Sequence, residues 1–310
     1  MTETTIKKHV SGATSGAYIK NDIGIELFYR VWEPTEIPKA HLVFVHGHGE
    51  HISRYIDVFD QFSKVGIKVL AFDQVGCGET GRRANDIGGA MGLKRVLLDI
   101  SLMIEQIYRP DIPLFLMGHS FGGAAILNYL ERGSMRELLY GAIASAPCIE
   151  VYKDSIPPNI VKHSLTFLAS YFPRLKVSVG VDISLLSRKK SVIELYKKDP
   201  FVFSKCALVQ LQDVLTGCQN LLKEGYKKIC VPRLLLAHGT GDRITSYEAT
   251  YSLATKLEGT GNIKHLEMKT YHGFYHELHF EPESDEVLAN YIKWIFDQLP
   301  KDSSLQPTTK

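Results

Sequence analysis

Short runs of apolar, β-branched and aromatic residues alternate along the chain with stretches whose apolar residues recur at helical spacing. The apolar runs predict strands at 26–31, 41–45, 68–72, 113–117, 142–145, 233–237 and 263–269. The stretches between them predict helices at 54–65, 92–108, 122–131, 247–257 and 286–298. Strands that alternate with helices of this length are typical of βαβ units. We therefore expect an α/β protein with a doubly wound, mostly parallel sheet.

The alternation is interrupted between Pro147 and about Val231. This interval contains helical and irregular sequence with prolines at 157, 158, 173 and 200, and it predicts no strand. An insertion between core strands generally packs over the carboxyl ends of the sheet, where ligands bind. We therefore divide the chain into a first core part at 1–147, a helical cap at 148–230, a second core part at 231–300 and a flexible tail at 301–310.

One stretch of the expected cap, from Asn159 to Leu175, has apolar residues at helical spacing. The stripe consists of Val161, Leu165, Leu168 and Phe172, widened by Ile160, Phe167 and Tyr171. Surface helices that pack on the domain beneath them show this pattern routinely. An amphipathic helix in a lipid interface shows it as well. Both interpretations stay open, and the second predicts a peripheral contact with a membrane or lipid droplet through the cap.

Composition and charge narrow the class of protein. An apolar content of 45% in 310 residues suffices for a large core, and a formal net charge of +2 with both signs mixed argues against a nucleic-acid surface. The five cysteines include no C-x-x-C pair, which is typical of free thiols in a reducing compartment. The first residues lack the apolar core of a signal peptide, and no run approaches the roughly 18 apolar residues of a membrane span. We expect an intracellular, cytoplasmic protein.

The candidate chemistry begins at Gly118-His119-Ser120-Phe121-Gly122-Gly123, between an expected strand and an expected helix. G-x-S-x-G in this setting is the nucleophile elbow of serine hydrolases, in which small glycines allow a turn tight enough to expose the hydroxyl. The helix N-terminus behind the turn favours developing negative charge. A plain turn of small residues is the alternative, but the setting favours Ser120 as a nucleophile.

A serine nucleophile needs a base and a carboxylate that orients the base. In this architecture they follow in the order serine, aspartate, histidine, each just after a late strand. Asp242 comes directly after the expected strand at 233–237, although an aspartate in a G-x-G-D turn is often only a turn former. The base is expected in the loop after the last strand, where the pattern alone does not distinguish His272, His276 and His279.

Residues 46–51 read His-Gly-His-Gly-Glu-His directly after an expected strand, and they suggest two kinds of site. One is a zinc site, but it would need further ligands downstream, and the histidines there are accounted for by the serine mechanism. The other is an oxyanion hole, made of backbone N–H groups from this loop and from the residue after the nucleophile. The amides of His48 and Phe121 fit that role, with Gly47 and Gly49 allowing the loop to turn. We expect the second site, and we expect neither a metal nor an organic cofactor.

With these motifs assembled, the chain resembles the monoglyceride lipases, α/β-hydrolases that cleave monoacylglycerols. The resemblance covers residues 25–298 and rests on HGHGEHISRY, FDQVGCGETGRR, GHSFGG, LLSRKKSVIELYKKDPF, LAHGTGDRIT and YHELH. Two departures from the family pattern are Phe121, where methionine is usual, and His48, where a small or apolar residue is common. Both change the walls of the expected acyl site and leave the expected catalytic residues untouched.

The resemblance implies an α/β-hydrolase fold with a helical cap and assigns roles to individual residues. It makes Ser120 the nucleophile, Asp242 the orienting acid and His276 the base, which selects one of the three histidines. It also implies an oxyanion hole at the amides of His48 and Phe121. The residues that it implies around the glycerol part of the substrate are Glu50, Arg54, His119 and Tyr196.

The expected reaction is hydrolysis of a monoacylglycerol, or a similar lipid ester, to glycerol and free fatty acid through an acyl-enzyme. A lysophospholipase or a broad carboxylesterase would use the same residues. A catalytically idle α/β-hydrolase that serves as a binding module is an alternative of another class. A missing member of the triad would favour the idle protein, and none is missing from the sequence.

Overall fold

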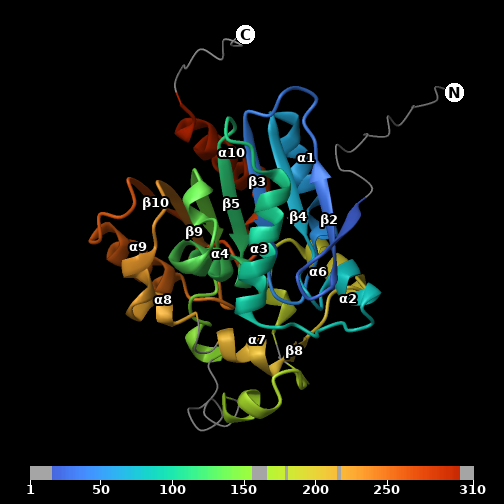
Figure 1. Ribbon diagram of the computed structural model, residues 1–310. Coiled ribbons are helices and arrows are strands. Elements are labelled where there is room, and N and C mark those ends of the chain that lie inside the picture. Colours follow the sequence, from blue (N-terminus) through green and yellow to red (C-terminus); the bar gives the residue numbers. More distant parts are fainter. Residues whose placement is uncertain (1–15, 156–165, 179–180, 215–217, 301–310) are drawn as a thin grey trace, which may run out of the picture.

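Eight strands form one sheet in the computed structural model, which describes residues 16–155, 166–178, 181–214 and 218–300 (Figure 1). In spatial order the strands are β1 (Ala17–Lys20), β2 (Glu26–Trp32), β4 (Ile67–Phe72), β3 (Ala40–Val45), β5 (Leu114–His119), β6 (Gly141–Ser145), β9 (Arg233–Gly239) and β10 (His265–Tyr271). β2 pairs antiparallel with β1 and β4, and the pairs from β4 through β10 are parallel. The predicted mostly parallel α/β sheet is confirmed.

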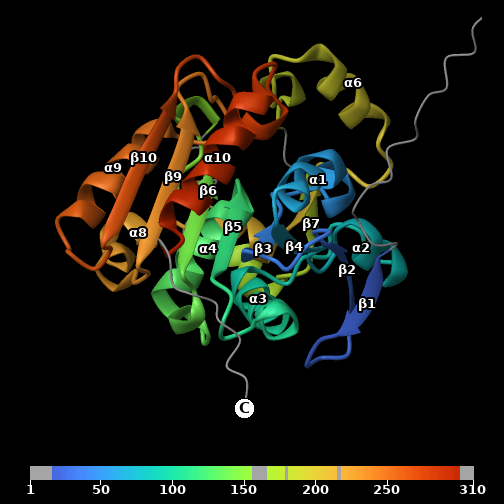
Figure 2. The ribbon, with the colours of Figure 1, turned by 90° about the horizontal axis from the view of Figure 1, so that it is seen from above.

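Helices cover both faces of this sheet (Figure 2). One face carries α1 (Ile56–Lys64) and α10 (Ser284–Gln298), and the other carries α3 (Leu93–Ile107), α4 (Phe121–Arg132) and α9 (Tyr247–Glu258). Successive residues of β3 point to opposite faces. Leu42 and Phe44 accordingly pack with α1 and α10, whereas Val43 and Val45 pack with α3 and α4. A continuous apolar run is therefore what a central strand of this sheet requires.

The seven predicted strands and five predicted helices are all present, with ends that differ by a few residues. The sequence missed β1 and the six-residue α2 (Gly78–Arg83). The expectation that the interval from Pro147 to Val231 holds no strand is wrong, because β7 (Lys176–Ser178) and β8 (Lys205–Ala207) form an antiparallel pair. Strands of three residues carry no alternating pattern of their own, so only their pairing across the fold defines them.

The chain between β6 and β9 also contains the helices α6 (Lys190–Lys198), α7 (Leu208–Gln212) and α8 (Asn220–Lys223). In Figure 1, α7 and β8 lie below the carboxyl ends of the central strands. Several backbone hydrogen bonds join this interval to the core, and they include Phe203 N–H to the Gly49 carbonyl at 3.1 Å and Glu277 N–H to the Leu186 carbonyl at 2.8 Å. We call residues 148–230 the cap; its boundaries stay a prediction, and the expected flexible tail at 301–310 lies outside the described residues.

The amphipathic stripe of the cap is described only in part. Ile160, Val161 and Leu165 lie outside the described residues. The remaining members, Phe167, Leu168, Tyr171 and Phe172, are all exposed. The described part of the stripe therefore faces away from the protein core. No helix within the described ranges is both long enough and apolar enough to cross a membrane.

Candidate active site

Ser120 occupies the turn between β5 and α4 in a conformation that non-glycine residues rarely adopt, with φ 54° and ψ −119°. Glycines on either side make the turn sterically feasible. A β-carbon at Gly122 would lie 2.1 Å from the Val45 carbonyl oxygen, and one at Gly118 would lie 2.4 Å from the Gly122 carbonyl oxygen. The G-x-S-x-G pattern is therefore explained by backbone contact at the edge of the sheet, as in a nucleophile elbow.

Ser120, His276 and Asp242 form one hydrogen-bonded series. Ser120 Oγ lies 2.8 Å from His276 Nε2, and His276 Nδ1 lies 2.7 Å from Asp242 Oδ2. The three residues follow β5, β10 and β9, whose parallel alignment brings their carboxyl ends to one edge of the sheet. This spacing suits transfer of a proton from the hydroxyl to the imidazole, and it supports the predicted triad.

Asp242 is held as an anion in a fully buried position. Its Oδ1 accepts from the backbone N–H groups of Ile244 and Thr245 at 2.7 and 3.0 Å, and its Oδ2 accepts from the Thr245 hydroxyl at 2.8 Å. Burial acts to raise the pKa of Asp242, but the imidazoles of His276 and His238 outweigh it and hold the pKa well below its usual value. Asp242 therefore keeps a negative charge beside the base.

That charge sets the proton affinity and the tautomer of His276. Burial acts to lower the pKa of His276, but the Asp242 carboxylate more than compensates, so the pKa lies above its ordinary value. Because the carboxylate accepts at Nδ1, the neutral ring carries its proton there and presents a lone pair at Nε2. A lone pair at that atom is what a general base facing Ser120 needs.

His272, His276 and His279, the three candidates for the base that the sequence pattern did not distinguish, have different surroundings in the structure. His272 is exposed, His276 is buried beside Ser120, and His279 is buried behind the site. The His279 ring lies 4.7 Å from the ring of His119 and 4.9 Å from that of Tyr55. Neither ring nitrogen of His279 has a hydrogen-bond partner among the described residues. Only His276 is placed to exchange a proton with Ser120.

The three histidine rings of residues 46–51 diverge to separate partners instead of converging. The contacts are His46 Nε2 with the Gln74 backbone N–H at 3.0 Å, His48 Nδ1 with Gln210 Oε1 at 3.0 Å, and His51 Nε2 with Asp199 Oδ2 at 2.8 Å. Within the described part of the chain, no group of three or more His, Cys, Asp or Glu side chains is arranged to hold a metal ion.

The loop that contains His48 lies directly against Ser120. A β-carbon at Gly47 would lie 3.2 Å from Ser120 Cβ, and the Gly47 N–H donates to Glu50 Oε1 at 2.6 Å. Gly49 has a φ of 71°, which turns the chain back on itself. On the other side of Ser120, Phe121 begins α4, so its N–H is among the first-turn donors that have no acceptor within the helix. The oxyanion assignment of His48 and Phe121 stays a prediction that this placement supports.

Two cavities meet at Ser120, His276 and His48. The larger, of about 360 Å³, is bounded on the cap side mainly by apolar side chains. Those residues include Val181, Ile183, Leu186, Val202 and Phe203. The smaller, of about 30 Å³, brings together the four predicted substrate residues Glu50, Arg54, His119 and Tyr196. An apolar space and a polar space therefore adjoin on either side of the serine.

Arg54 contacts several of the residues that surround the polar cavity. Its guanidinium donates to both carboxylate oxygens of Glu277, at 2.7 and 2.8 Å, and to Glu50 Oε2 at 2.6 Å. It also lies 4.8 Å from the ring centroid of Tyr196 in the cap. Burial acts to lower the pKa of Arg54, but Glu277 and Glu50 raise it well above its usual value. Sequence reasoning missed Glu277, although it directly follows the candidate base in the YHELH motif.

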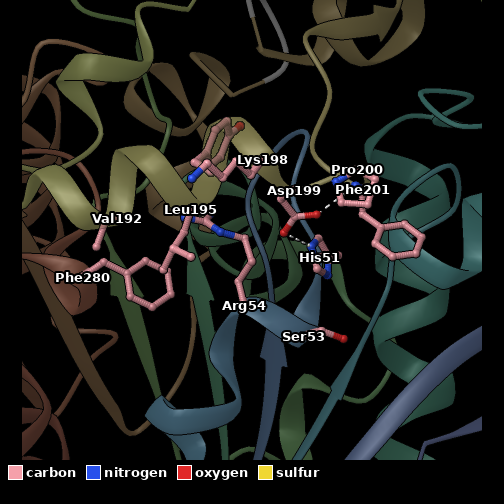
Figure 3. Close-up of a pocket in the computed structure, with 11 residues that line it drawn as sticks. His51, Ser53, Arg54, Val192, Leu195, Lys198, Asp199, Pro200, Phe201 and Phe280 are labelled. Atoms are coloured by element: carbon pink, nitrogen blue, oxygen red, sulfur yellow. Dashed lines mark hydrogen bonds and ion pairs between the residues drawn. The ribbon is translucent and has the colours of Figure 1, made fainter.

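A third cavity, of about 530 Å³, shares Arg54 and Tyr196 with the polar cavity but does not include Ser120 (Figure 3). Leu195 and Phe280 line it, together with the hydrogen-bonded pair His51 and Asp199. Because Asp199 directly follows α6, this pair fastens the end of that cap helix to the core loop.

The sequence and the fold both have close counterparts among known proteins. A model of the family described as serine aminopeptidase, S33, matches residues 36–283. The monoglyceride lipase of Homo sapiens is 30% identical over 94% of this chain and 93% of its own length, and that of Rattus norvegicus is 31% identical over 90% and 89%. The crystal structure of the monoacylglycerol lipase of Paleococcus ferrophilus matches with a TM-score of 0.77 and 27% identity, over 88% of this chain and 99% of that one.

Proposed function

The chain belongs to the monoglyceride lipases, within the serine aminopeptidase S33 family of α/β-hydrolases, and from that premise we propose that it hydrolyses monoacylglycerols to glycerol and free fatty acid. The observation that carries the proposal is the series Ser120–His276–Asp242, whose serine lines both an apolar and a polar cavity. An ester that joins a long acyl chain to a small polyol needs both kinds of space around its carbonyl carbon.

In the first half of the proposed reaction, His276 Nε2 takes the Ser120 proton as Oγ attacks the ester carbonyl carbon. The backbone N–H groups of His48 and Phe121 stabilise the resulting oxyanion. The imidazolium, stabilised by Asp242, then returns the proton to the leaving glycerol oxygen, and the acyl group stays on Ser120.

In the second half, water takes the place of glycerol. His276 removes a proton from the water as its oxygen attacks the acyl-enzyme, and the same two amides stabilise the second oxyanion. Collapse of this intermediate releases the fatty acid and returns the proton to Ser120 Oγ. Every proton moves between groups of this chain, the substrate and water.

The two cavities suggest how the substrate is oriented. We assign the acyl chain to the apolar cavity and the glycerol hydroxyls to the polar one. There, Glu50 is an acceptor, and the Tyr196 hydroxyl and the His119 ring are further polar groups. Arg54 already engages both Glu50 and Glu277, so its main role is to hold the acceptor carboxylate in place.

We further propose that the cap contacts the lipid surface in which monoacylglycerols reside. Phe167, Tyr171 and Phe172 have 65%, 66% and 59% of their surface exposed, and an exposed apolar patch commonly marks an interaction site. The cap also contains 13 lysines and arginines against 7 acidic residues, whereas the whole chain has 36 against 34. Exposed aromatic rings combined with excess positive charge suit a membrane surface that carries anionic lipids.

A labelling experiment tests the nucleophile. A fluorophosphonate probe should label the wild type and Ser204→Ala, a control serine that lines the same apolar cavity, but should not label Ser120→Ala. Labelling of Ser120→Ala at the wild-type level would exclude the mechanism.

A substrate panel tests the reaction class. The purified protein should release fatty acid from monoacylglycerols with a higher kcat/KM than from diacylglycerols, lysophospholipids or simple alkyl esters. A higher kcat/KM for lysophospholipids would instead make the protein a lysophospholipase, and no turnover of any ester would favour the idle binding module.

A further inference from the structure

The imidazole of His48 is fixed by the cap. Its Nδ1 lies 3.0 Å from Oε1 of Gln210, a buried residue of α7. The ring also meets Phe203 edge to face, with the centroids 5.7 Å apart. The neighbouring Gly49 carbonyl accepts from the Phe203 backbone N–H at 3.1 Å. The side chain of the residue whose amide is the proposed oxyanion donor is thus attached to cap residues, and so is the carbonyl of the next residue, Gly49.

The direction of the hydrogen bond between His48 and Gln210 follows from the chemistry of the two groups. Burial is the largest effect on the pKa of His48 and lowers it, so the ring is neutral at pH 7 and carries one N–H. An amide oxygen can only accept, so that proton resides on Nδ1. The Cys206 sulfur lies 3.6 Å from Gln210 Oε1 and 3.3 Å from the Ala207 carbonyl oxygen, and its single hydrogen can be donated to only one of them at a time. Gln210 therefore acts as a fixed acceptor that sets both the tautomer and the orientation of the ring.

Gln210 is fixed in turn, because α7 is anchored at both ends. At the first end, the backbone N–H groups of Leu208 and Val209 donate to the carbonyls of Leu175 and Pro173, each at 2.9 Å. At the other end, Asp213 accepts from the backbone N–H of Leu93, the first residue of α3, at 2.5 Å. The acceptor that holds His48 is therefore supported by both the cap and the core.

We propose that Gln210 is a positioning residue for the oxyanion hole and acts through the His48 ring. This inference rests on the proposed function, since it concerns the amide that would stabilise the oxyanion. The His48 peptide lies between Gly47 and Gly49, so neighbouring side chains restrict its rotation little. The Gln210 contact adds a restraint on the His48 ring to the backbone hydrogen bonds at Gly47 and Gly49, and it holds the His48 N–H toward the substrate carbonyl.

A restraint on the position of the His48 N–H should affect kcat, because an oxyanion donor must lie at a precise distance from the developing charge. An oxyanion donor acts at about 2.7–3.1 Å from the developing charge, and loss of one donor typically lowers kcat by about 10²–10³. A donor that is displaced but still present loses only part of that effect. Loss of the Gln210 acceptor should therefore lower kcat by about tenfold. KM should change little, because the interaction is made mainly in the transition state.

The first test compares two substitutions of similar length. Gln210→Met removes the acceptor, whereas Gln210→Glu retains an oxygen for His48 Nδ1–H. With a short soluble ester as substrate, Gln210→Met should lower kcat by about tenfold at nearly unchanged KM, and Gln210→Glu should keep kcat within about threefold of the wild type. A wild-type kcat in Gln210→Met, or equal losses in both variants at equal melting temperature, would overturn the proposal.

The second test separates positioning from simple packing of the cap. His48→Ala keeps the backbone N–H and removes the ring through which Gln210 is proposed to act. In that background, Gln210→Met should change kcat by less than about twofold, which makes the double-mutant cycle strongly non-additive. The same tenfold loss in both backgrounds would show that Gln210 supports the cap independently of His48, contrary to the proposal. If the wild type turned over no ester, the proposed function itself would fail, and that result is distinct from both outcomes.

Discussion

Arg54 and Glu277 form two parallel hydrogen bonds, and Glu277, which is buried, directly follows the candidate base His276 in the chain. The Glu277 backbone N–H also donates to the Leu186 carbonyl in the cap at 2.8 Å. The loop that carries the base is thus held by a core arginine and by the cap. A bidentate pair between arginine and a carboxylate is directional as well as strong, so it constrains the position of this loop.

We expect Glu277→Gln to destabilise the protein and reduce turnover. The substitution keeps the shape of the side chain but leaves buried positive charge on Arg54 less compensated, and breaking a buried pair typically costs about 3–5 kcal/mol. Urea denaturation measures the stability, and kcat on a short ester measures the effect on the base. Glu224→Gln is the matched control, because it breaks an exposed pair with Lys227 and should change neither quantity. Equal results for both variants would contradict a structural role for the buried pair.

The pH dependence of kcat/KM should report His276. Turnover needs the neutral ring, so activity should be lost as the pH falls through the pKa of His276, which lies above the ordinary value of about 6.5. Asp242→Asn removes the charge that raises this pKa, so the midpoint of the acid limb should move to lower pH. The same variant should lower kcat by about 10⁴, as in other Ser-His-Asp hydrolases. If the midpoint were unchanged in Asp242→Asn, the loss of kcat/KM at low pH would have to come from protonation of a group other than His276.

Alanine substitution should identify which histidine of the loop after β10 is the general base, a question that the sequence pattern alone does not answer. His276→Ala should lower kcat by several orders of magnitude, on the order of 10³ or more, since loss of a triad member removes general-base catalysis. His272→Ala is the control from the same loop; this residue is exposed, and its replacement should leave kcat and melting temperature unchanged. If His272→Ala were inactive and His276→Ala were active, the assignment of His276 as the general base would be wrong.

The sequence predicted most of the core because local pattern determines it. The central strands are buried on both faces, so they appear as continuous apolar runs, and the elbow serine lies where such a run meets a helix. The order Ser120, Asp242, His276 follows from the architecture, since each residue comes just after a strand of the same sheet. These features depend on residues that are near one another in the chain.

What the sequence missed depends on contacts between distant segments. Arg54 and Glu277 are 223 positions apart, and His48 and Gln210 are 162 positions apart. No periodicity connects such residues, and their pairing becomes visible only when the core and the cap are placed together. The short strands β7 and β8 have the same explanation, because each is defined by its partner and not by its own three residues.

The glycines of the elbow should tolerate substitution far less than glycines at the surface. A β-carbon at Gly122 would lie 2.1 Å from one carbonyl oxygen and 2.5 Å from the next, so Gly122→Ala must displace the backbone of β3 or α4. We expect loss of soluble protein, or a fall in melting temperature together with loss of turnover. Gly259→Ala is the control, since a β-carbon there has 3.5 Å to its nearest neighbour and the residue has a helical φ of −68°. A stable, active Gly122→Ala variant would contradict the steric explanation of the motif.

The last prediction concerns the exposed rings of the cap. Phe167 and Tyr171 contact each other, with ring centroids 5.0 Å apart, and both are mostly exposed. We expect the double substitution Phe167→Asp, Tyr171→Asp to leave the melting temperature and the turnover of a short soluble ester unchanged. The same variant should bind vesicles of phosphatidylcholine and phosphatidylserine at least about tenfold more weakly, because burial of one aromatic side chain contributes about 1.5–3 kcal/mol.

The control for the cap experiment is Tyr251→Asp, which replaces another exposed ring, on α9 outside the cap. It should bind vesicles and hydrolyse vesicle-borne monoacylglycerol like the wild type. Wild-type binding should weaken when phosphatidylserine is omitted or salt is added, since both reduce the attraction of the basic cap to the surface. If the cap variant instead lost stability and short-ester turnover together with binding, the rings would be packing against protein, because a buried carboxylate destabilises the fold whatever the substrate. Vesicle binding that is unchanged in the cap variant would exclude these rings as the contact.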